Sequence, residues 1–529
     1  MEAGETLSAA AHRAGVTINA DCAGQGTCGK CKIKIIEGDS GLPDSAEKDL
    51  LSKEELASDI RLACRVKARE DMTVQVLTAV GNMGRKKDMA RLPEDFIPEK
   101  KPQKPGEPEA YYGLAFDIGT TTVVGMLWDL RKAEPVGAVA GANPQSDYGA
   151  DVISRIMYCG MAEGNLQRMQ EKILGRLNAI VREFCENYGI HPENINEAVA
   201  VGNTTMSHLL LAVDPKSLAL APFSPGFTGP VTVKAGELGL KIHADARVNI
   251  LPNIAGHVGA DIVAVLLASG LEKMEGANLA IDIGTNGEIL LARGGRVLTC
   301  STAAGPAFEG ASIKQGMRAS TGAIEGINIQ DGKVELSVIG DSDPIGICGS
   351  GLIDCVSELL KAGIVTKKGK LMTQAEAREA GFPDFLSERL AAEESGNSFI
   401  LYSKGKGKKV SITQKDIREV QLAKGAILAG IRIMMQELDL KDEDIDRVFL
   451  AGAFGNYIRV ESALAIGLLP SVNRSIVSSV GNAAGAGASM ALLSGGALEK
   501  AYRLAEEAEH IELAAHSDFQ AVYLQSMYF

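Results

Sequence analysis

The chain has 529 residues, of which 46% are hydrophobic and 23% charged, as in a globular protein with several domains. Its net charge of −13 argues against nonspecific binding to nucleic acid, and its nine cysteines are too few for a disulfide scaffold. No signal peptide and no long apolar run is found, so we expect a cytoplasmic protein without a membrane span. The Gly/Ala-rich segment 481–496 is typical of small-residue packing instead.

Four cysteines near the start have the spacing of metal ligands. Cys22, Cys28 and Cys31 lie in the glycine-rich segment DCAGQGTCGKC, and Cys64 follows in the segment LACRV. The spacing C-x5-C-x2-C-x32-C fits a [2Fe–2S] cluster that is held by one loop and one returning strand. Two other interpretations stay open, a structural zinc site and four unligated thiols. Zinc is disfavoured because its sites usually use paired C-x2-C knuckles.

The loop around these cysteines is rich in glycine. Gly24, Gly26 and Gly29 let backbone N–H groups approach the sulfur atoms, and such hydrogen bonds tune a cluster's potential. The alternation in 32–36 predicts a strand that leaves the loop. Residues 24–29 also match G-x-G-x-x-G, but they follow no predicted strand, so we reject a dinucleotide site.

With these motifs, residues 1–82 resemble the [2Fe–2S] ferredoxins of the β-grasp fold, in the C-x5-C spacing of the adrenodoxin-type branch. The resemblance implies a β-grasp domain whose last strand is 72–76. Residues 5–15 are predicted to be a helix, and the first β-hairpin of that fold is not found before Cys22.

Residues 83–110 are predicted to be a linker. From residue 84 on they are charged, contain five prolines and show no apolar periodicity. Extended Pro-rich chain rises about 3.1 Å per residue, so we expect a reach of tens of ångströms. The remaining residues, 111–529, alternate short apolar runs with amphipathic helical patterns, which is an α/β signature.

This α/β region contains an internal repeat. LAFDIGT at 114–120 and LAIDIGT at 279–285 are identical at six of seven positions, and an apolar run follows each. Each copy predicts a strand, a tight turn and a second strand. We therefore expect two related lobes, 111–275 and 276–529, with a cleft between them and one turn on each wall.

The repeated turn offers a site for phosphate, whereas no G-x4-G-K-[ST] loop is present. Glycine lets backbone amides approach phosphate oxygens, threonine hydroxyls add donors, and an aspartate at the strand end can hold Mg²⁺ through water. We assign the catalytic role to the two aspartates. The candidates are Asp117, Gly119, Thr120 and Thr121 in the first lobe and Asp282, Gly284, Thr285 and Asn286 in the second.

Other glycine-rich segments complete a nucleotide site. Residues 448–456 are predicted to form a strand and a turn beside the adenosine, with Gly452, Phe454 and Gly455 as candidates. Gly305 lies in the loop 303–310, which is predicted near phosphate. The segments 200–206 and 479–484 form another matched pair. The general base stays open between Asp151 and Asp261, because an aspartate at a helix start is more often a cap.

The order of these motifs resembles the acetate and sugar kinase/Hsp70/actin superfamily. The resemblance implies two ribonuclease H-like lobes, ATP and Mg²⁺ between them, and hydrolysis coupled to lobe closure. It covers most of residues 111–529.

The combination of ferredoxin motif, Pro-rich segment and ATPase resembles the reductive activators of corrinoid enzymes. The segments 143–154 and 346–354 also look like that family. The resemblance implies ATP-dependent transfer of one electron from the cluster, which converts Co(II) to Co(I) in a methyl-transfer system. It further implies a corrinoid protein and an upstream electron donor as partners, and it allows a homodimer. No residue in the sequence indicates a cobalt contact.

Three alternatives stay open. An activator of a radical dehydratase would have a related ATPase fold, but it would carry a bridging [4Fe–4S] cluster. A small-molecule kinase with a redox sensor would phosphorylate a metabolite. A ferredoxin with a regulatory nucleotide domain would bind ATP without using it to drive electron transfer.

Overall fold

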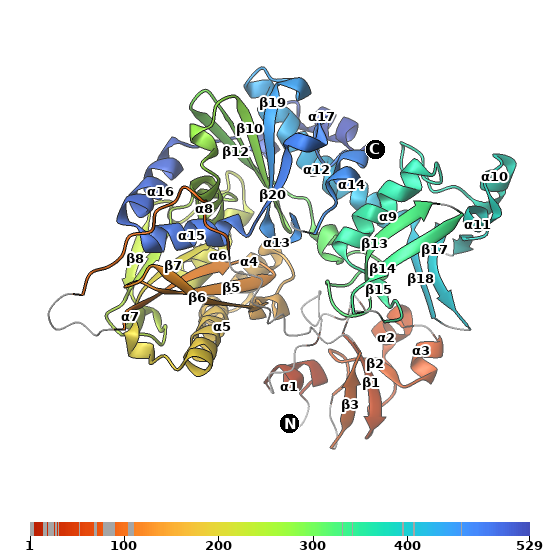
Figure 1. The fold of residues 1–529 in the computed structure, drawn as a ribbon. Helices are drawn as coiled ribbons and strands as arrows, with labels where there is room; N and C mark the ends of the chain where they lie inside the picture. Colours follow the sequence, from red (N-terminus) through yellow and green to blue (C-terminus); the bar gives the residue numbers. More distant parts are fainter. Residues whose placement is uncertain are drawn as a thin grey trace.

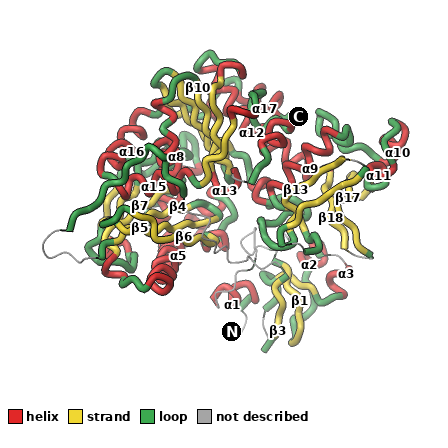
Figure 2. The backbone as a smooth tube through the Cα atoms, viewed as in Figure 1, coloured by secondary structure: helices red, strands yellow, loops and turns green. Residues whose placement is uncertain are grey.

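The structure is a computed structural model. It describes residues 5–13, 18, 26, 29, 31–51, 53–67, 71–77, 90–103, 110–330, 332–340, 342–393, 396–405, 408–455 and 457–529. Figure 1 shows a small N-terminal unit, two sheets that form the main body, and a further group of strands and helices beside them. The same view coloured by secondary structure shows helices on both sides of the two large sheets (Figure 2).

The N-terminal unit is a three-stranded antiparallel sheet with three short helices. Its elements are α1 (Leu7–Arg13), β1 (Lys32–Glu37), α2 (Ser45–Leu50), α3 (Lys53–Ala57), β2 (Ile60–Leu62) and β3 (Thr73–Val76), with β1 in the centre of the sheet. The predicted helix and both predicted strands are confirmed. A buried ion pair between Arg61 and Glu47, with Nη2 and Oε2 2.6 Å apart, fastens α2 to β2. Residues 22 and 28 lie outside the described residues.

The first lobe is a six-stranded sheet in the order β6-β5-β4-β7-β9-β8. Its strands are β4 (Tyr112–Ile118), β5 (Thr122–Asp129), β6 (Glu134–Ala142), β7 (Ile195–Gly202), β8 (Val231–Lys234) and β9 (Arg247–Ile250). Its helices are α4 (Val152–Met161), α5 (Asn165–Tyr188), α6 (Thr204–Leu211), α7 (Ala235–Leu238) and α8 (Ala260–Ser269). Strands β4 to β6 form an antiparallel meander, and β7 lies parallel to β4.

The second lobe repeats this plan in the order β20-β19-β10-β11-β12-β21. Its strands are β10 (Ala277–Ile283), β11 (Gly287–Arg293), β12 (Arg296–Thr302), β19 (Ile445–Ala451), β20 (Val477–Gly481) and β21 (Glu509–His510). Its helices are α12 (Gln414–Glu437), α13 (Gly452–Gly455), α14 (Val460–Ala465), α15 (Ala483–Leu493), α16 (Gly495–Glu507) and α17 (Phe519–Ser526). As in the first lobe, the first strand of the antiparallel hairpin has a parallel strand on its other side. Here β10 pairs with β11 in antiparallel fashion and with β19 in parallel fashion.

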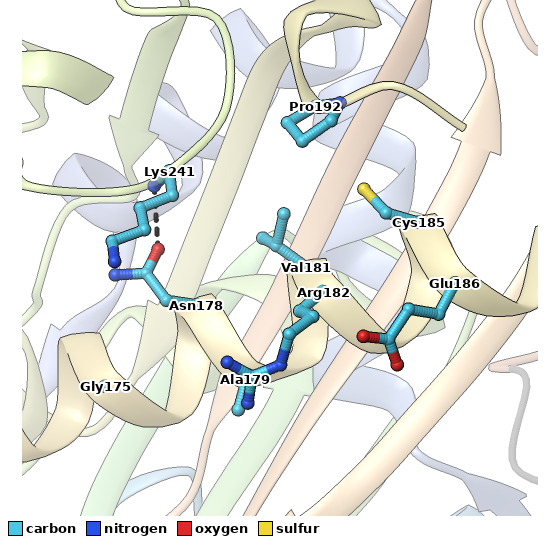
Figure 3. Close-up of a pocket in the computed structure, with 9 residues that line it drawn as sticks. All are labelled: Gly175, Asn178, Ala179, Val181, Arg182, Cys185, Glu186, Pro192 and Lys241. Carbon is cyan, nitrogen blue, oxygen red and sulfur yellow. Dashed lines mark hydrogen bonds between the residues drawn. The ribbon is translucent and has the colours of Figure 1, made fainter. Parts of the chain in front are cut away.

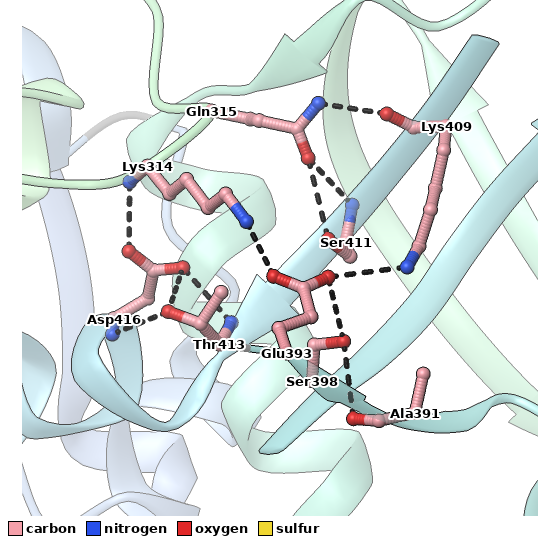
Figure 4. A network of polar contacts seen from close by, with 9 residues as sticks. All are labelled: Lys314, Gln315, Ala391, Glu393, Ser398, Lys409, Ser411, Thr413 and Asp416. Atoms are coloured by element: carbon pink, nitrogen blue, oxygen red, sulfur yellow. Dashed lines mark hydrogen bonds and ion pairs between the residues drawn. The ribbon is translucent and has the colours of Figure 1, made fainter. Parts of the chain in front are cut away.

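Residues 323–413 form a subdomain inserted between β12 and α12. Its elements are β13 (Ala323–Gln330), β14 (Lys333–Val338), β15 (Gly346–Ile347), α9 (Gly349–Lys361), α10 (Gln374–Glu379), α11 (Asp384–Ser387), β16 (Leu390–Glu393), β17 (Gly396–Lys404) and β18 (Lys408–Thr413). A polar network joins this subdomain to the preceding loop and to α12 (Figure 4). Lys314 donates its backbone N–H to Asp416 and its ammonium group to Glu393, and Glu393 also accepts from Lys409.

Helices α8 and α15 cross between the two large sheets. Helix α15 follows β20 of the second lobe but packs against α8, β4 and β7. One core cluster contains these helices together with Ala115 of the first sheet and Leu290 of the second. Gly487 lies at the crossing, where an added Cβ atom would be 2.0 Å from the carbonyl oxygen of Ala264. The predicted small-residue packing of 481–496 is thus confirmed, whereas the division at residue 275 stays a prediction.

Residues 90–103, which belong to the predicted linker, pack against the first lobe and against α15; we name this segment the strap (Figure 1). Ala90 is buried in the cluster around α8 and α15, and Phe96 packs against it. The backbone N–H of Glu99 donates to Leu493, and the ammonium group of Lys101 pairs with Glu197. These few apolar side chains and polar contacts hold the strap on the main body, although its composition alone is typical of a linker.

Among the described residues, no helix combines the length and the apolar character needed to cross a bilayer.

The substitution Gly487→Ala is expected to lower the free energy of unfolding by about 1–3 kcal/mol, because α8 and α15 would have to separate to admit a methyl group. The thermal unfolding midpoint would measure this loss. A matched control is Gly175→Ala in α5, where an added Cβ atom meets no neighbour within 4 Å. That control is expected to be neutral or to stabilise by about 0.5–1 kcal/mol. Equal shifts in the two variants would contradict the close crossing.

Candidate functional site

The two copies of the repeat form the tight turns that the sequence predicts. The N–H of Gly119 donates to the carbonyl of Thr122 at 3.0 Å between β4 and β5, and the N–H of Gly284 donates to the carbonyl of Asn286 at 3.0 Å between β10 and β11. A Cβ atom on Gly119 would lie 2.6 Å from the carbonyl oxygen of Thr122, so the first turn requires glycine. Each turn directly follows a strand whose next-to-last residue is the aspartate.

Four acidic side chains lie near enough to affect one another's charge: Asp117 and Asp282 near the ends of β4 and β10, Asp261 at the start of α8, and Glu288 on β11. Desolvation raises the pKa of Asp117 to about 6 and, with the nearby charge of Asp117, that of Asp282 to about 7. Burial and these two carboxylates raise the pKa of Asp261, and burial raises that of Glu288. We name these four residues the carboxyl set.

The carboxyl set repels itself when ionised, so it favours a bound cation. Among the described residues, no three His, Cys, Asp or Glu side chains converge closely enough to hold a metal ion directly. Mg²⁺ usually keeps several of its waters and binds one or two carboxylates. The arrangement therefore suits Mg²⁺ held partly through water, which is the mode that the sequence predicts for Asp117 and Asp282.

Two helix-capping asparagines reach the first turn. Asn203 caps α6 and donates its Nδ2 to the hydroxyl of Thr120 at 3.0 Å. Asn482 caps α15 and is hydrogen-bonded through its side chain to Asp117, which lowers the pKa of that carboxyl against the effect of burial. These residues occupy equivalent places in the matched segments 200–206 and 479–484, so each segment contributes one polar group.

The segment 143–154 and the residue that follows it each donate a hydrogen bond to the backbone of the same turn. Asn143 donates its Nδ2 to the carbonyl of Gly119 at 2.9 Å, and the fully buried Arg155 donates to the carbonyl of Thr120 at 2.6 Å. Asp151 accepts from the N–H of Ser154 as the cap of α4. Of the two candidates for a general base, Asp151 thus has a capping role, whereas Asp261 belongs to the carboxyl set.

Glu309 joins the two turns, and the sequence analysis does not identify it. The hydroxyl of Thr121 donates to its Oε2 at 2.7 Å, and the hydroxyl of Thr285 donates to its Oε1 at 2.8 Å. The residue ends the short 3₁₀ helix Pro306–Glu309 in the predicted phosphate loop. In that loop, the glycine-rich pattern pointed to Gly305 as a candidate but did not point to Glu309.

Glu288 is the second residue that the sequence analysis does not identify. It replaces an apolar residue of the repeat, because the equivalent position in the first copy is Val123. Glu288 lies opposite Asp282 in the register of β10 and β11, and its side chain is hydrogen-bonded to Asn286. A charged residue in an otherwise apolar strand is a signal that could have been used.

The predicted adenosine segment lies beside the second aspartate. Gly452 has φ +84°, and a Cβ atom there would be 2.4 Å from Oδ1 of Asp282. Gly455 ends α13, and the side chain of Phe454 lies outside the described residues. Gly305 has φ +76° and open space at its Cβ position. Gly452 therefore lets the backbone approach the carboxylate of Asp282, and Gly305 leaves open space in its loop.

Two of the four predicted cluster ligands can be placed, since Cys22 and Cys28 lie outside the described residues. The Sγ atoms of Cys31 and Cys64 are 3.3 Å apart and buried. This separation is far above the ~2.05 Å of a disulfide, and a tetrahedral ion with ~2.3 Å bonds to sulfur needs two thiolates at a similar spacing. The loop glycine Gly26 has φ +76°. The described donors therefore fit a thiolate-bound cluster.

A groove of about 680 Å³ lies elsewhere, on the first lobe beside α5 (Figure 3). Its lining includes Asn178, which accepts from the N–H of Lys241 at 2.7 Å, and Cys185. Burial raises the pKa of the Cys185 thiol, which keeps it protonated. The groove shares no residue with the carboxyl set, so it is separate from the candidate site.

Three family models match the chain. Residues 1–69 match the 2Fe-2S iron-sulfur cluster binding domain, residues 112–274 match the RACo middle region, and residues 276–529 match the C-terminal domain of RACo, the ASKHA domain.

Similar proteins cover most of the chain. The corrinoid activation enzyme RamQ of Eubacterium limosum is 39% identical over 82% of this chain and 72% of its own. The reductase of the Co(II) methylated amine-specific corrinoid protein of Methanosarcina barkeri is 27% identical over 78% of this chain and 76% of its own. A solved reductive activator for corrinoid, iron-sulfur protein superposes with a TM-score of 0.71 and 31% identity, over 99% of this chain and 95% of that one.

The substitution Asp282→Asn is expected to raise the unfolding midpoint of the nucleotide-free protein at pH 8, because it removes one charge from the carboxyl set. The pKa of Asp282 is raised from 3.8 to about 7, so this carboxyl destabilises the fold increasingly as the pH rises from about 4 through 7. The gain should therefore shrink as the pH falls towards 4, and the stabilisation that Mg²⁺ and ATP give the native protein should be lost.

The exposed Asp384 provides a control, since Asp384→Asn should leave both properties unchanged. A gain for Asp282→Asn that is independent of pH would contradict the role of desolvation.

Proposed function

The chain belongs to the family of reductive activators of corrinoid proteins, and we propose that it uses ATP to drive one electron onto a corrinoid protein, converting Co(II) to Co(I). The observation that carries the proposal is the meeting of the two turns at Glu309. Hydroxyl donors from both lobes point at one place, so a phosphate bound there contacts both lobes. Binding and hydrolysis of ATP can then change how the lobes are joined.

The chain's own residues divide this work. Asp117 and Asp282 hold Mg²⁺ through water, and the turn residues Gly119, Thr120, Thr121, Gly284, Thr285 and Asn286 cradle the phosphates. Asp261 is our candidate for the group that accepts a proton from the attacking water when it is ionised, because it lies in the first turn of α8 within the carboxyl set, whereas Asp151 caps α4. Gly305, Gly452, Phe454 and Gly455 border the nucleotide.

Cys22, Cys28, Cys31 and Cys64 hold the [2Fe–2S] cluster, which supplies a one-electron carrier. Plant-type clusters of this kind have potentials near about −400 mV, and the Co(II)/Co(I) couple is expected to be lower, so unaided transfer is uphill. For one electron, about 59 mV corresponds to about 1.4 kcal/mol, so about 5 kcal/mol from ATP would shift the balance by roughly 200 mV.

The proposal includes finer points about the chain's surroundings. The relative from Methanosarcina barkeri is named for a Co(II) corrinoid protein, which supports a corrinoid protein as the partner here. An upstream electron donor, a cytoplasmic location and a homodimer belong to the same proposal, as does the absence of nucleic-acid and membrane partners. The division into units 1–82, 83–110, 111–275 and 276–529 is proposed with the strap as part of the second unit.

The test is an anaerobic reduction assay. The cluster is reconstituted and reduced, a Co(II) corrinoid methyl-transfer protein is added, and the Co(I) absorbance is followed with ATP, with a non-hydrolysable analogue and with neither. Co(I) is expected to accumulate only with ATP. Equal reduction without ATP would indicate a ferredoxin with a regulatory nucleotide site, and a phosphorylated metabolite would indicate a kinase. No reduction by an intact cluster would favour the dehydratase-type activator.

The variants Asp282→Ala and Cys64→Ser separate the two halves of this function. Asp282→Ala should keep the cluster spectrum, and its Co(I) yield should fall to the level without ATP. Cys64→Ser should lose the cluster spectrum and the Co(I), but it should still hydrolyse ATP, because the cysteine belongs to the separate N-terminal unit. Full steady-state reduction by an Asp282→Ala protein that no longer hydrolyses ATP would refute the coupling.

A further inference from the structure

Glu309 holds both lobes at the place where the proposed function puts a phosphate. Its carboxylate extends from the second lobe, and each of its oxygens accepts one threonine hydroxyl, at 2.7 Å from Thr121 of the first lobe and 2.8 Å from Thr285 of its own lobe. The bond to Thr121 therefore joins the lobes through a single side chain.

A threonine hydroxyl has one O–H to donate. In this structure both hydroxyls give that proton to Glu309, so neither can give it to a phosphate oxygen at the same time. A second acceptor with negative charge is also repelled by the carboxylate at this distance. Glu309 and a bound phosphate group thus exclude each other at these two threonines.

The surroundings keep the carboxylate in this place. The buried guanidinium of Arg155, which donates to the turn carbonyl of Thr120, attracts Glu309 from the side of the first lobe. On the other side, Gly310 has φ +80°, and a Cβ atom on it would lie 2.6 Å from the carbonyl oxygen of Met317. The positive charge of Arg155 therefore attracts the Glu309 carboxylate, and the tight backbone packing at Gly310 fixes the loop that follows Glu309.

From these contacts we propose that Glu309 is a latch: it joins the lobes without nucleotide, and the terminal phosphate of ATP displaces it. This inference rests on the proposed function, because it takes the threonine turns as the phosphate site. Glu309 acts as a positioning residue that competes with the substrate.

Release of the latch also reaches the inserted subdomain. The loop that follows Glu309 continues into Lys314 and Gln315, which are tied to the subdomain by the network of Figure 4. Gln315 donates its Nε2 to the carbonyl of Lys409 and accepts from the N–H of Ser411. Displacement of Glu309 is therefore coupled through this loop to β18, which contains no residue of the proposed phosphate site.

The test measures the affinity of the full-length protein for Mg²⁺ with a non-hydrolysable ATP analogue by calorimetry. Glu309→Ala removes the competitor and is expected to bind the analogue roughly ten-fold more tightly, a change of about 1.4 kcal/mol, because both threonine hydroxyls become free to donate to phosphate. Glu309→Gln keeps the size but loses the charge, so its affinity should lie between those of the other two proteins. Glu325→Ala, which removes an exposed carboxylate of the same lobe, is the matched control and should bind like the native protein.

A second measurement uses amide exchange in residues 310–317. In the native protein, adding the analogue should speed exchange there because the latch opens, whereas in Glu309→Ala exchange should be fast before nucleotide is added. If Glu309→Ala fails to fold, Glu309→Gln carries both measurements.

Unchanged affinity in both Glu309 variants would overturn the proposal, and so would weaker binding, which would make Glu309 a nucleotide ligand. A native protein that binds no nucleotide would instead refute the proposed function.

Discussion

The crossing of α8 and α15 is the contact on which the candidate site depends. Both helices pass between the two large sheets, and Gly487 lets them approach until backbone meets backbone at Ala264. Each helix also begins at the site: α8 with Asp261 and α15 with its cap Asn482. The packing that buries the interlobe core therefore also sets the distance between these polar groups and the strand-end aspartates.

The same site works against the stability of the fold. Desolvation and the mutual repulsion of these carboxyls raise the pKa values of Asp117 and Asp282, so their ionised forms lower the stability of the fold at neutral pH. A bound cation relieves this repulsion without protonation of the carboxylates, so ligand binding and stability are linked through the same residues. Glu309 adds an anion of the protein itself, but two hydroxyls and the nearby Arg155 compensate it.

What the sequence predicts well is local. The DIGT copies are near-identical, and near-identical short segments form the same strand, turn and strand, so both turns could be placed without a structure. Glu309 could not be paired with Thr121, because 188 positions separate them and no local pattern encodes the contact. The packing of the strap within the predicted linker could not be seen for the same reason: Ala90 and Phe96 are too sparse for a periodic signal, and their partners are the distant helices α8 and α15. The sequence places Asn482 in a matched segment but does not predict its contact with Asp117, because that contact forms only when α15 crosses between the lobes.

The strap changes what kind of encounter delivers the electron. Because residues 90–103 are fixed to the main body, only residues 78–89 connect that body to the ferredoxin-like unit, and the chain from Leu77 to Ala90 can span no more than about 47 Å. A carrier confined to such a radius has an effective concentration in the millimolar range at any surface within it. For a partner that docks within that radius, the encounter with the cluster is a first-order step. Its rate does not depend on the concentration of the protein in the cell.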